Sequence, residues 1–273
     1  MRLINGLPAE RLDLSDRAFQ FGDGVFRTFY ARDGKVPFLL RHLARLRADA
    51  LALGIHAPDD ATWLADLGRA VTGDATIKLI LTRGETPRGY TYPADIQPNR
   101  IVQISPLAPP RAFAEGGARV RVCATRAGWQ PRLAGIKHLN RLENVLARAE
   151  WQDPSIFEGL LLDRDDQVIE GCMSNILMLE DDQLITPVLD GAGVAGVMRD
   201  VAMTAAGQLG WPVAQDRISL PRLLVAQQVW LCNSLIGLVP VGQLAGVNLA
   251  LDQRDAALRM ATEIVASKES FSL

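Results

Sequence analysis

The chain has 273 residues, of which 48% are hydrophobic and 22% are charged, close to the average of soluble globular proteins. This composition excludes a disordered or low-complexity protein, and the length allows one large domain or two of ordinary size. The net charge of −2 does not favour nucleic acid or an anionic membrane surface as a partner. The apolar runs are too short to cross a bilayer, and the first residues lack the apolar core of a signal peptide, so we expect a cytoplasmic protein.

The cysteines and histidines do not follow a metal-binding pattern. Cys123, Cys172 and Cys232 are widely spaced and form no CxxC pair, and none of the three histidines lies near a cysteine in the sequence. We therefore expect no zinc site and no disulfide framework. The cysteines are interpreted as small buried residues.

The first hundred residues alternate between predicted strands and helices. Leu39, Leu43, Leu46 and Leu53 recur at helical spacing, whereas the segment 76–82 (TIKLILT) is typical of a strand. The turn at 32–35 (RDGK) contains the Asp-Gly pair of a hairpin. Strands are predicted over 1–4, 25–31, 76–82 and 101–104, and helices over 38–53 and 60–71.

A proline- and glycine-rich stretch predicts a domain boundary. We expect an N-terminal domain over 1–105, a linker over 106–117 and a C-terminal domain over 118–273 that carries Lys137. The pattern indicates a mixed α/β (α+β) fold of two domains with a ligand-binding cleft between them. In the second half, strands are predicted over 118–124 and 228–232, hairpins around 164–167 and 180–183, and helices directly after Lys137 and over 197–209.

Lysine is rare in this chain. Only four of the 29 basic residues are lysine, namely Lys35, Lys78, Lys137 and Lys268. Arginine cannot supply a neutral amine for Schiff-base chemistry, so the position of each lysine merits individual inspection. Lys137 follows Gly135 and precedes an apolar helical pattern, which suits a catalytic lysine on a rigid element. A lysine that simply points into water at the start of a helix is the alternative.

Other segments have residues suited to binding an anion or a heterocycle. Glu170 ends a strand before a glycine, where its carboxylate could meet a protonated ring nitrogen or could lie exposed at a sheet edge. The run 191–196 (GAGVAG) opens a helix and would present backbone N–H groups to a phosphate, although flexible loops before helices have the same composition. Arg83 and Arg88 flank a loop and suit a substrate carboxylate.

Together these segments resemble the fold-type IV enzymes that use pyridoxal phosphate (PLP), a family of branched-chain and D-amino-acid aminotransferases and aminodeoxychorismate lyases. The similarity covers nearly the whole chain. It lies in the blocks DRAFQFGDGVF (16–26), HLARL (42–46), RGETPRGY (83–90), GIKHLNRLENVL (135–146), EGCMSNI (170–176) and GVMR (196–199).

The resemblance assigns roles to individual residues. It implies that Lys137 forms the Schiff base with PLP and is also the general base, and that Glu170 pairs with the pyridine nitrogen. It implies that Arg45 and the helix-start amides of Val197 and Met198 bind the cofactor phosphate. Ser234 and Arg141 complete the implied cofactor-binding set, and the family's homodimeric state is expected here as well.

The run KHLNRLE at 137–143 is similar to the lyase branch, which forms 4-aminobenzoate and pyruvate in folate biosynthesis. This branch has a threonine two residues after the phenylalanine of GDGxF, here Thr28, which is implied to assist proton delivery. Arg27 stands where a small residue is expected. Arg27, Arg83 and Arg88 are the candidates for the two carboxylates of this small-molecule substrate. An aminotransferase acting on branched-chain or D-amino acids is the alternative function.

Overall fold

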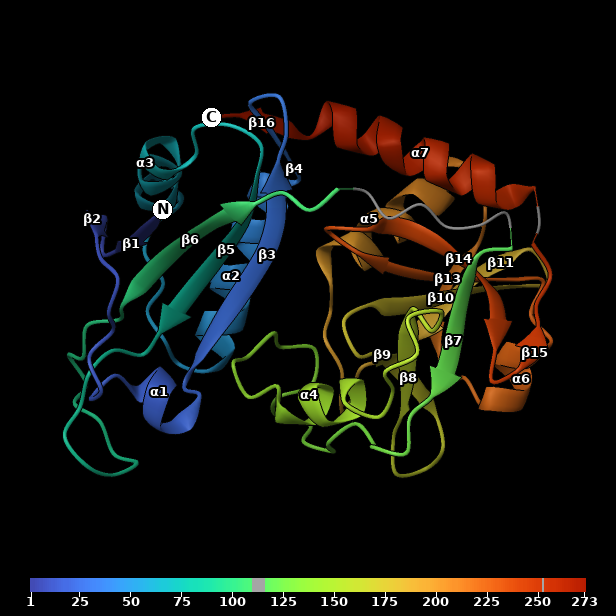
Figure 1. Ribbon diagram of the computed structural model, residues 1–273, viewed down its shortest axis with the longest axis horizontal. Coiled ribbons are helices and arrows are strands. Elements are labelled where there is room, and N and C mark those ends of the chain that lie inside the picture. The colour runs from blue at the N-terminus through green and yellow to red at the C-terminus, as the bar shows by residue number, and fades with distance from the viewer. Residues whose placement is uncertain (110–115, 252) are drawn as a thin grey trace. The chain divides into compact units, whose positions relative to one another are not determined.

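The computed structural model describes residues 1–109, 116–251 and 253–273 (Figure 1). The chain divides into two compact units. Unit 1 comprises Met1–Pro109, Ile136–Asn140 and Ala266–Leu273, and unit 2 comprises Pro110–Gly135 and Arg141–Val265. This division differs from the predicted domains because two short segments of the second half, one of them containing Lys137, belong to unit 1. Residues 110–115 of the predicted linker lie outside the described residues.

Unit 1 is built on an antiparallel five-stranded sheet (Figure 1). The leucine stripe of helix α2 packs with Trp63 and Leu67 of helix α3 and with the strands in one apolar core. In sheet order the strands are β2 (Leu7–Pro8), β1 (Arg2–Ile4), β6 (Arg100–Pro106), β5 (Ala75–Thr82) and β3 (Gly24–Ala31). The helices are α1 (Arg17–Phe21), α2 (Leu39–Ala52) and α3 (Asp60–Ala70), and β4 (Lys35–Pro37) pairs with β16 (Ser270–Ser272).

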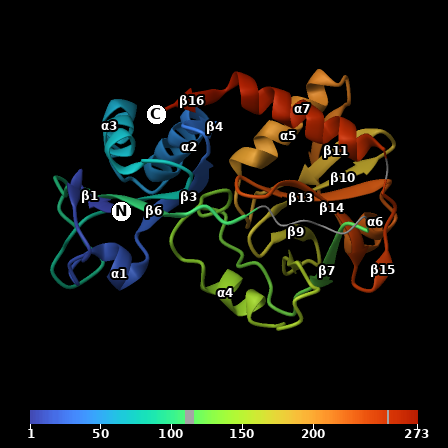
Figure 2. The same ribbon diagram turned by 45° about the horizontal axis from the view of Figure 1, so that its top comes forward.

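Unit 2 contains a larger mixed sheet (Figure 2). Parallel pairs join β11 to β12, β14 to β7 and β7 to β8, and the other neighbours are antiparallel. In sheet order the strands are β12 (Val213–Asp216), β11 (Gln183–Pro187), β10 (Asn175–Glu180), β13 (Gln228–Asn233), β14 (Gly237–Leu244), β7 (Ala118–Val122), β8 (Glu158–Leu162) and β9 (Val168–Gly171), with β15 (Val247–Asn248) beside β14. The helices are α4 (Leu142–Arg148), α5 (Val197–Gln208), α6 (Leu220–Leu224) and α7 (Arg254–Lys268), of which α7 ends in unit 1. The predicted α/β class is confirmed.

The predicted strands and helices of the first hundred residues are confirmed to within two residues at most ends. The helix predicted directly after Lys137 is wrong in its start, because α4 begins only at Leu142. The apolar residues Leu142, Val145 and Leu146 of this helix are 69%, 60% and 55% exposed. Before α4, the backbone of Lys137 and Leu139 bonds to strand β3 instead of forming a helix.

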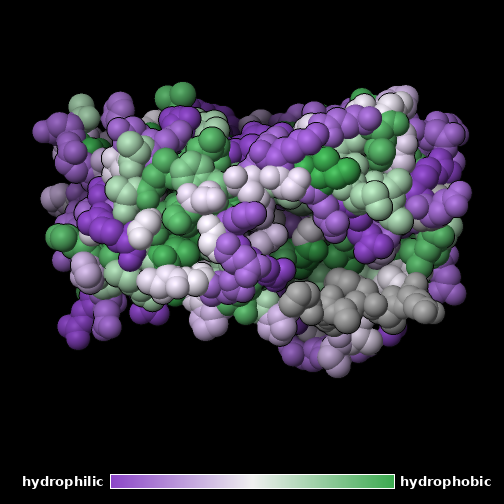
Figure 3. Space-filling model, turned by 90° about the horizontal axis from the view of Figure 1, so that it is seen from above, coloured by the Kyte–Doolittle hydropathy of each residue, from purple (hydrophilic) through white to green (hydrophobic). Residues whose placement is uncertain are grey.

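The three cysteines are buried and unpaired, which confirms their interpretation as small core residues. Across the parts of the chain that the structure describes, none of the helices combines the length and the apolar character needed to traverse a bilayer. Seen from above, hydrophilic and hydrophobic residues are interspersed on the surface (Figure 3). Scattered apolar residues of this kind are ordinary on a globular protein.

Candidate active site

Lys137 is fixed through its main chain on both sides. Its backbone N–H donates to Asp49 Oδ2 of α2 at 2.9 Å, and its carbonyl accepts from the backbone N–H of Phe26 at 3.0 Å. The segment continues along the free edge of β3, where the Leu139 N–H donates to the Gly24 carbonyl at 2.9 Å. Ile136 is buried in the core of unit 1. These contacts explain why a lysine expected at the start of a helix stands instead on an extended segment.

The side chain of Lys137 lies over an aromatic ring. Its Nζ is 4.6 Å from the ring centroid of Phe26, and the residue is half-buried. Because side chains alternate along a strand, Phe26 and Thr28 share the half-buried face of β3, while Arg27 lies on the buried face. Thr28 therefore lies on strand β3, and Lys137 lies beside that strand. The Lys137 amine reaches the face of β3 that carries Phe26 and Thr28.

Lys78 is a functional candidate that the sequence analysis did not select. It is paired in register with Thr28 across the sheet, and its Nζ is 4.9 Å from the same Phe26 ring. Burial lowers the pKa of Lys78, and no carboxylate of the described residues pairs with its ammonium group. Two features of the sequence could have indicated Lys78: it is one of only four lysines, and it lies in the alternating segment 76–82.

Arg27 is buried, and its guanidinium forms an ion pair with Asp49. The same Nη2 donates to the Arg45 carbonyl at 3.5 Å. Arg45 is half-buried and lies one helical turn before Asp49 on α2, so the two residues share a helix face. This environment favours a structural role of Arg27 over its predicted role in substrate binding, because a protein carboxylate already occupies the guanidinium.

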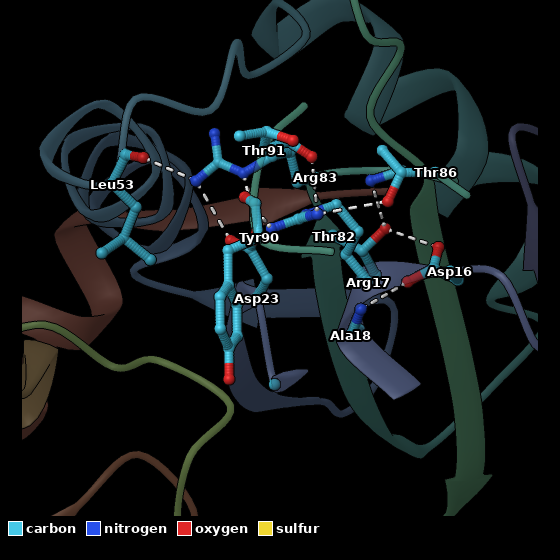
Figure 4. A network of polar contacts seen from close by, with 12 residues as sticks. Asp16, Arg17, Ala18, Asp23, Leu53, Thr82, Arg83, Thr86, Tyr90 and Thr91 are labelled. Carbon is cyan, nitrogen blue, oxygen red and sulfur yellow. Dashed lines mark hydrogen bonds and ion pairs between the residues drawn. The ribbon is translucent and has the colours of Figure 1, made fainter. Parts of the chain in front are cut away.

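Arg83 is likewise engaged by the protein itself (Figure 4). Its Nε and Nη2 donate to the two carboxylate oxygens of Asp23 at 2.8 and 3.0 Å, and Nη1 and Nη2 donate to the carbonyls of Gly54 and Leu53. Asp23 also accepts from Arg17 Nε at 2.8 Å. Burial alone would raise the pKa of Asp23, but the hydrogen bonds from Arg83 and Arg17 outweigh it, and the pKa is lowered. Arg83 is thus a scaffold residue.

Arg88 differs from the other two predicted substrate-binding arginines because it is exposed. Its loop is tied down by Arg17, whose guanidinium donates to the carbonyls of Gly89 and Tyr90 at 3.1 and 3.0 Å and to Thr86 Oγ1 at 3.1 Å (Figure 4). The structure therefore presents the Arg88 side chain to solvent from a loop whose backbone is held in place.

His42 is buried behind the Lys137 segment and stacks on Phe29 with ring centroids 4.6 Å apart. Burial, followed by the positive charges of Arg27 and Lys137, lowers the pKa of His42 to about 3. The imidazole is therefore neutral at physiological pH, and within the described residues neither ring nitrogen has a hydrogen-bond partner. These properties exclude His42 as an acid–base group near neutral pH.

In unit 2, Glu170 lies at the end of strand β9 and is buried. Its Oε2 accepts from the backbone N–H of Val194 at 2.8 Å, so the carboxylate is fixed to the glycine-rich loop. The turn that follows is held by the buried Glu158, which accepts from Ser174 Oγ at 2.8 Å and from the Met173 N–H at 3.2 Å. Glu170 is not the exposed edge residue that was the alternative interpretation.

The loop before α5 requires its glycines because it packs tightly against neighbouring side chains. A Cβ on Gly191 would lie 2.2 Å from the Trp129 ring, and a Cβ on Gly196 would lie 2.2 Å from Asn175 Oδ1. The Asn175 side chain donates to the Val194 carbonyl at 2.6 Å and accepts from the Gly196 N–H at 3.2 Å. Asn175, which lies in the EGCMSNI block but was given no role, therefore shapes this loop.

Helix α5 begins directly after Gly196, which as the N-cap residue has no side chain to cap the first turn. Val197 and Met198 are buried at this start. The roles of their amides toward a cofactor phosphate stay predictions. Arg199, the next residue, does not face a ligand site. It donates to Thr186 Oγ1 and Gln215 Oε1 and anchors α5 to strands β11 and β12.

The two remaining predicted cofactor-binding residues occupy turns of unit 2. Ser234 is half-buried in the turn after β13, where the side chain of Asn233 accepts from the backbone N–H groups of Leu235 and Ile236. Arg141 is half-buried and is the residue preceding helix α4. Their roles toward a cofactor stay predictions.

Unit 1 thus presents Lys137 and Thr28 together with three further basic residues, Arg45, Lys78 and Arg88. Unit 2 presents the buried carboxylate of Glu170 and the start of helix α5. The model of the family described as amino-transferase class IV matches residues 24–244. The chain belongs to this family. The predicted resemblance to the fold-type IV enzymes is therefore confirmed.

Two class IV relatives and one solved structure are informative. The aminodeoxychorismate lyase of Vibrio harveyi is 37% identical over 254 residues, which cover 91% of this chain and 93% of the relative. The D-alanine aminotransferase of Listeria monocytogenes is 29% identical, over 92% of this chain and 90% of its own. The crystal structure of 4-amino-4-deoxychorismate lyase from Pseudomonas aeruginosa is 42% identical, with a TM-score of 0.90, and covers 95% of this chain and 97% of that one.

Proposed function

We propose that this class IV protein is an aminodeoxychorismate lyase, which converts 4-amino-4-deoxychorismate to 4-aminobenzoate and pyruvate with PLP as cofactor. The similarity to two lyases at 37% and 42% identity supports this function, because the D-alanine aminotransferase is more distant at 29%. The observation that carries the proposal is the placement of the Lys137 amine over Phe26, on the face of β3 that also presents Thr28.

The residues of each unit fit PLP. Unit 1 supplies the primary amine of Lys137 and the guanidinium of Arg45, which suit an aldehyde and a phosphate. Unit 2 supplies an α5 start with glycine as its N-cap residue, suited to the phosphate, and the buried carboxylate of Glu170, suited to a protonated pyridine nitrogen. Only Ile136 separates Lys137 from Gly135, whose N–H and carbonyl bond to Gly193 and Ala195 of the loop before α5.

Bound PLP supplies an electron sink for the carbon that carries the substrate amine. Lys137, once its amine is free and neutral, removes the proton from that carbon as general base. Its main-chain clamp fixes the backbone from which the side chain extends toward the substrate. Thr28, on the half-buried face of β3, passes a proton to the departing pyruvyl group in this proposal, while the product ring becomes aromatic.

The substrate carries two carboxylates, and the structure favours Lys78 and Arg88 over Arg27 and Arg83 as their partners. Asp49 and Asp23 already pair with Arg27 and Arg83 in buried positions. Lys78 is half-buried beside the Phe26 ring without a carboxylate partner among the described residues, and Arg88 is exposed. A partly desolvated cation of this kind gains most from binding an anion.

Homodimer formation and a cytoplasmic location belong to the same proposal. The large apolar side chains of α4, Leu142, Val145 and Leu146, are more than half exposed in the single chain, which suits burial against a second copy. Three free buried cysteines suit a reducing compartment. Sedimentation of the purified protein tests the dimer.

Product analysis tests the proposed reaction. The PLP-loaded protein is mixed with enzymatically generated aminodeoxychorismate, and equal amounts of 4-aminobenzoate and pyruvate are expected. In parallel, the protein is given D-alanine or a branched-chain amino acid with 2-oxoglutarate. Amino transfer without 4-aminobenzoate release, from a protein that demonstrably binds PLP, would establish the aminotransferase instead.

A further inference from the structure

The backbone of Lys137 and that of Arg45 are joined by one buried ion pair. Asp49 Oδ2 accepts the Lys137 N–H at 2.9 Å and also accepts from Arg27 Nη2. The same Nη2 of Arg27 reaches the Arg45 carbonyl at 3.5 Å. Three elements of unit 1 therefore meet at this pair: strand β3, helix α2 and the extended Lys137 segment.

We propose that the Arg27–Asp49 pair is a positioning device that fixes the Lys137 main chain relative to Arg45. The proposal rests on the proposed function, in which Lys137 forms the Schiff base and Arg45 binds the phosphate. Arg27 and Asp49 are positioning residues and not catalytic ones, because Arg27 lies on the buried face of β3, opposite to Phe26 and Thr28.

The burial of the pair supports a geometric role. The side chains of Arg27 and Asp49 are only 2% and 5% exposed. Removing both charges from water costs several kcal/mol, so a buried pair of this kind seldom adds net stability compared with apolar residues of similar size. It does fix orientation, because a planar guanidinium and a carboxylate bind only in defined geometries.

The charges around Asp49 support the same conclusion. Arg27, Arg45 and Lys137 are the charged groups that act on this carboxylate, and all three are cationic, while the nearby His42 is neutral. Burial raises the pKa of Asp49, and these cations and the hydrogen bond from the Lys137 N–H oppose the increase. A single carboxylate thus balances several cations, of which Lys137 is one.

The pair also explains an irregularity of the sequence. Arg27 stands in the segment GDGVFRT where a small residue is expected. On the buried face of β3, an unpaired arginine would be strongly destabilising. Asp49, 22 positions later on α2, supplies the compensating charge.

A substitution at Asp49, matched with one at Asp66, tests the proposal. Asp66 is also a buried aspartate of unit 1, and its carboxylate accepts from Arg100 Nε at 2.7 Å and pairs with Arg69, both of which lie outside the Lys137 segment. Asp49→Asn and Asp66→Asn are loaded with PLP, and the visible band of the Lys137 Schiff base is titrated. Thermal denaturation is recorded for both.

Asp49→Asn is expected to lower the pKa of the protonated Schiff base by about one unit, because a negative charge near it is lost. Borohydride should still fix PLP to Lys137, and kcat should fall. Asp66→Asn is expected to lower the Tm without moving the titration. An Asp49→Asn protein that loses Tm in the same way but titrates like the wild type would overturn the proposal.

A second variant covers the case in which Asp49→Asn does not fold. Arg27→Met combined with Asp49→Asn leaves no unpaired buried charge, and it is expected to bind PLP several-fold more weakly than Asp66→Asn does. Equal PLP affinity in these two proteins would overturn the positioning role. If the wild type itself fixes no PLP with borohydride, the proposed function fails and this proposal fails with it. If the wild type does fix PLP, the Asp49→Asn titration tests the positioning role of the Arg27–Asp49 pair alone.

Discussion

The two units hold their functional groups by different physical means. In unit 1, buried ion pairs fix the basic side chains: Asp49 holds Arg27, and Asp23 holds both Arg83 and Arg17. In unit 2, the backbone does most of this work, since Glu170 is fixed by the Val194 N–H and the loop before α5 by close glycine packing.

This difference predicts different sensitivities. A charge removed from unit 1 leaves a buried partner unpaired, which costs several kcal/mol. A side chain added to the loop of unit 2 collides with its neighbours and displaces backbone amides. Charge-neutralising substitutions therefore test unit 1, and substitutions of glycine test unit 2.

The largest effect is expected from Lys137→Ala. Loss of the amine should abolish the visible band of the PLP-loaded protein and its lyase activity, because the nucleophile that forms the Schiff base is removed. Lys35→Ala, which removes an exposed lysine of the same unit, is the control and should change neither. An unchanged spectrum in Lys137→Ala would exclude the Schiff-base role.

Asp23→Asn should destabilise unit 1 by about 3 kcal/mol, because Arg17 and Arg83 both lose their counter-charge. Urea denaturation measures this difference. Asp60→Asn breaks the exposed pair with Arg47 and is expected to cost less than about 1 kcal/mol. Equal effects of the two variants would contradict the importance of burial.

The same aspartate predicts a pH dependence. The pKa of Asp23 is lowered in the folded protein, so its contribution to stability is fully present above its ordinary pKa of 3.8 and is lost as the pH falls through the lower folded value. Asp23→Asn should therefore lose less stability than the wild type between pH 5 and pH 2. A parallel loss in both proteins would show that other carboxylates dominate acid denaturation.

Thr28→Val removes one hydroxyl and keeps the shape of the side chain. Pyruvate release should slow by about a hundredfold, with PLP still bound, because a proton relay contributes on this scale. Thr76→Val, on the neighbouring strand β5, is the control and should leave the rate nearly unchanged. Loss of PLP from Thr28→Val would mean that Thr28 supports the cofactor instead.

Lys78→Met should raise the KM for aminodeoxychorismate about tenfold, as expected for the loss of one charged hydrogen bond, and should leave PLP binding intact. Lys78→Arg is the matched variant and should recover part of the affinity, because it restores the positive charge. A KM unaffected by Lys78→Met would leave Arg88 as the better candidate for the substrate carboxylate.

The smallest effects are expected from substitutions of two glycines, one at the start of α5 and one near its end. Gly207→Ala, near the end of α5, has open space around the new Cβ and should stabilise the protein by about 0.5–1 kcal/mol. Gly196→Ala places the Cβ against Asn175 Oδ1 and should weaken PLP binding measured by dialysis. If both substitutions left PLP affinity unchanged, the helix start would not be part of the phosphate site.

Much of the fold could be predicted from the sequence because the signals are local. Alternation in 25–31 and 76–82 and the leucine spacing of α2 reflect the burial of one face, which is repeated along the chain. Strand β14 and helix α7 were not predicted. The alternation of β14 is interrupted by Pro240 and glycines, and the apolar residues of α7 form only a weak stripe.

Motif similarity determined the family, the candidate lysine and the substrate class, because these depend on residue types at fixed spacing. The tertiary structure decided which charges are available. Arg27, Arg83 and Arg88 look alike in the sequence, but folding brings Asp49 and Asp23 to the first two from distant positions and leaves Arg88 exposed. Burial and pairing are properties of the packed chain, and for this reason the sequence alone could not distinguish the three arginines or find Lys78 beside Phe26.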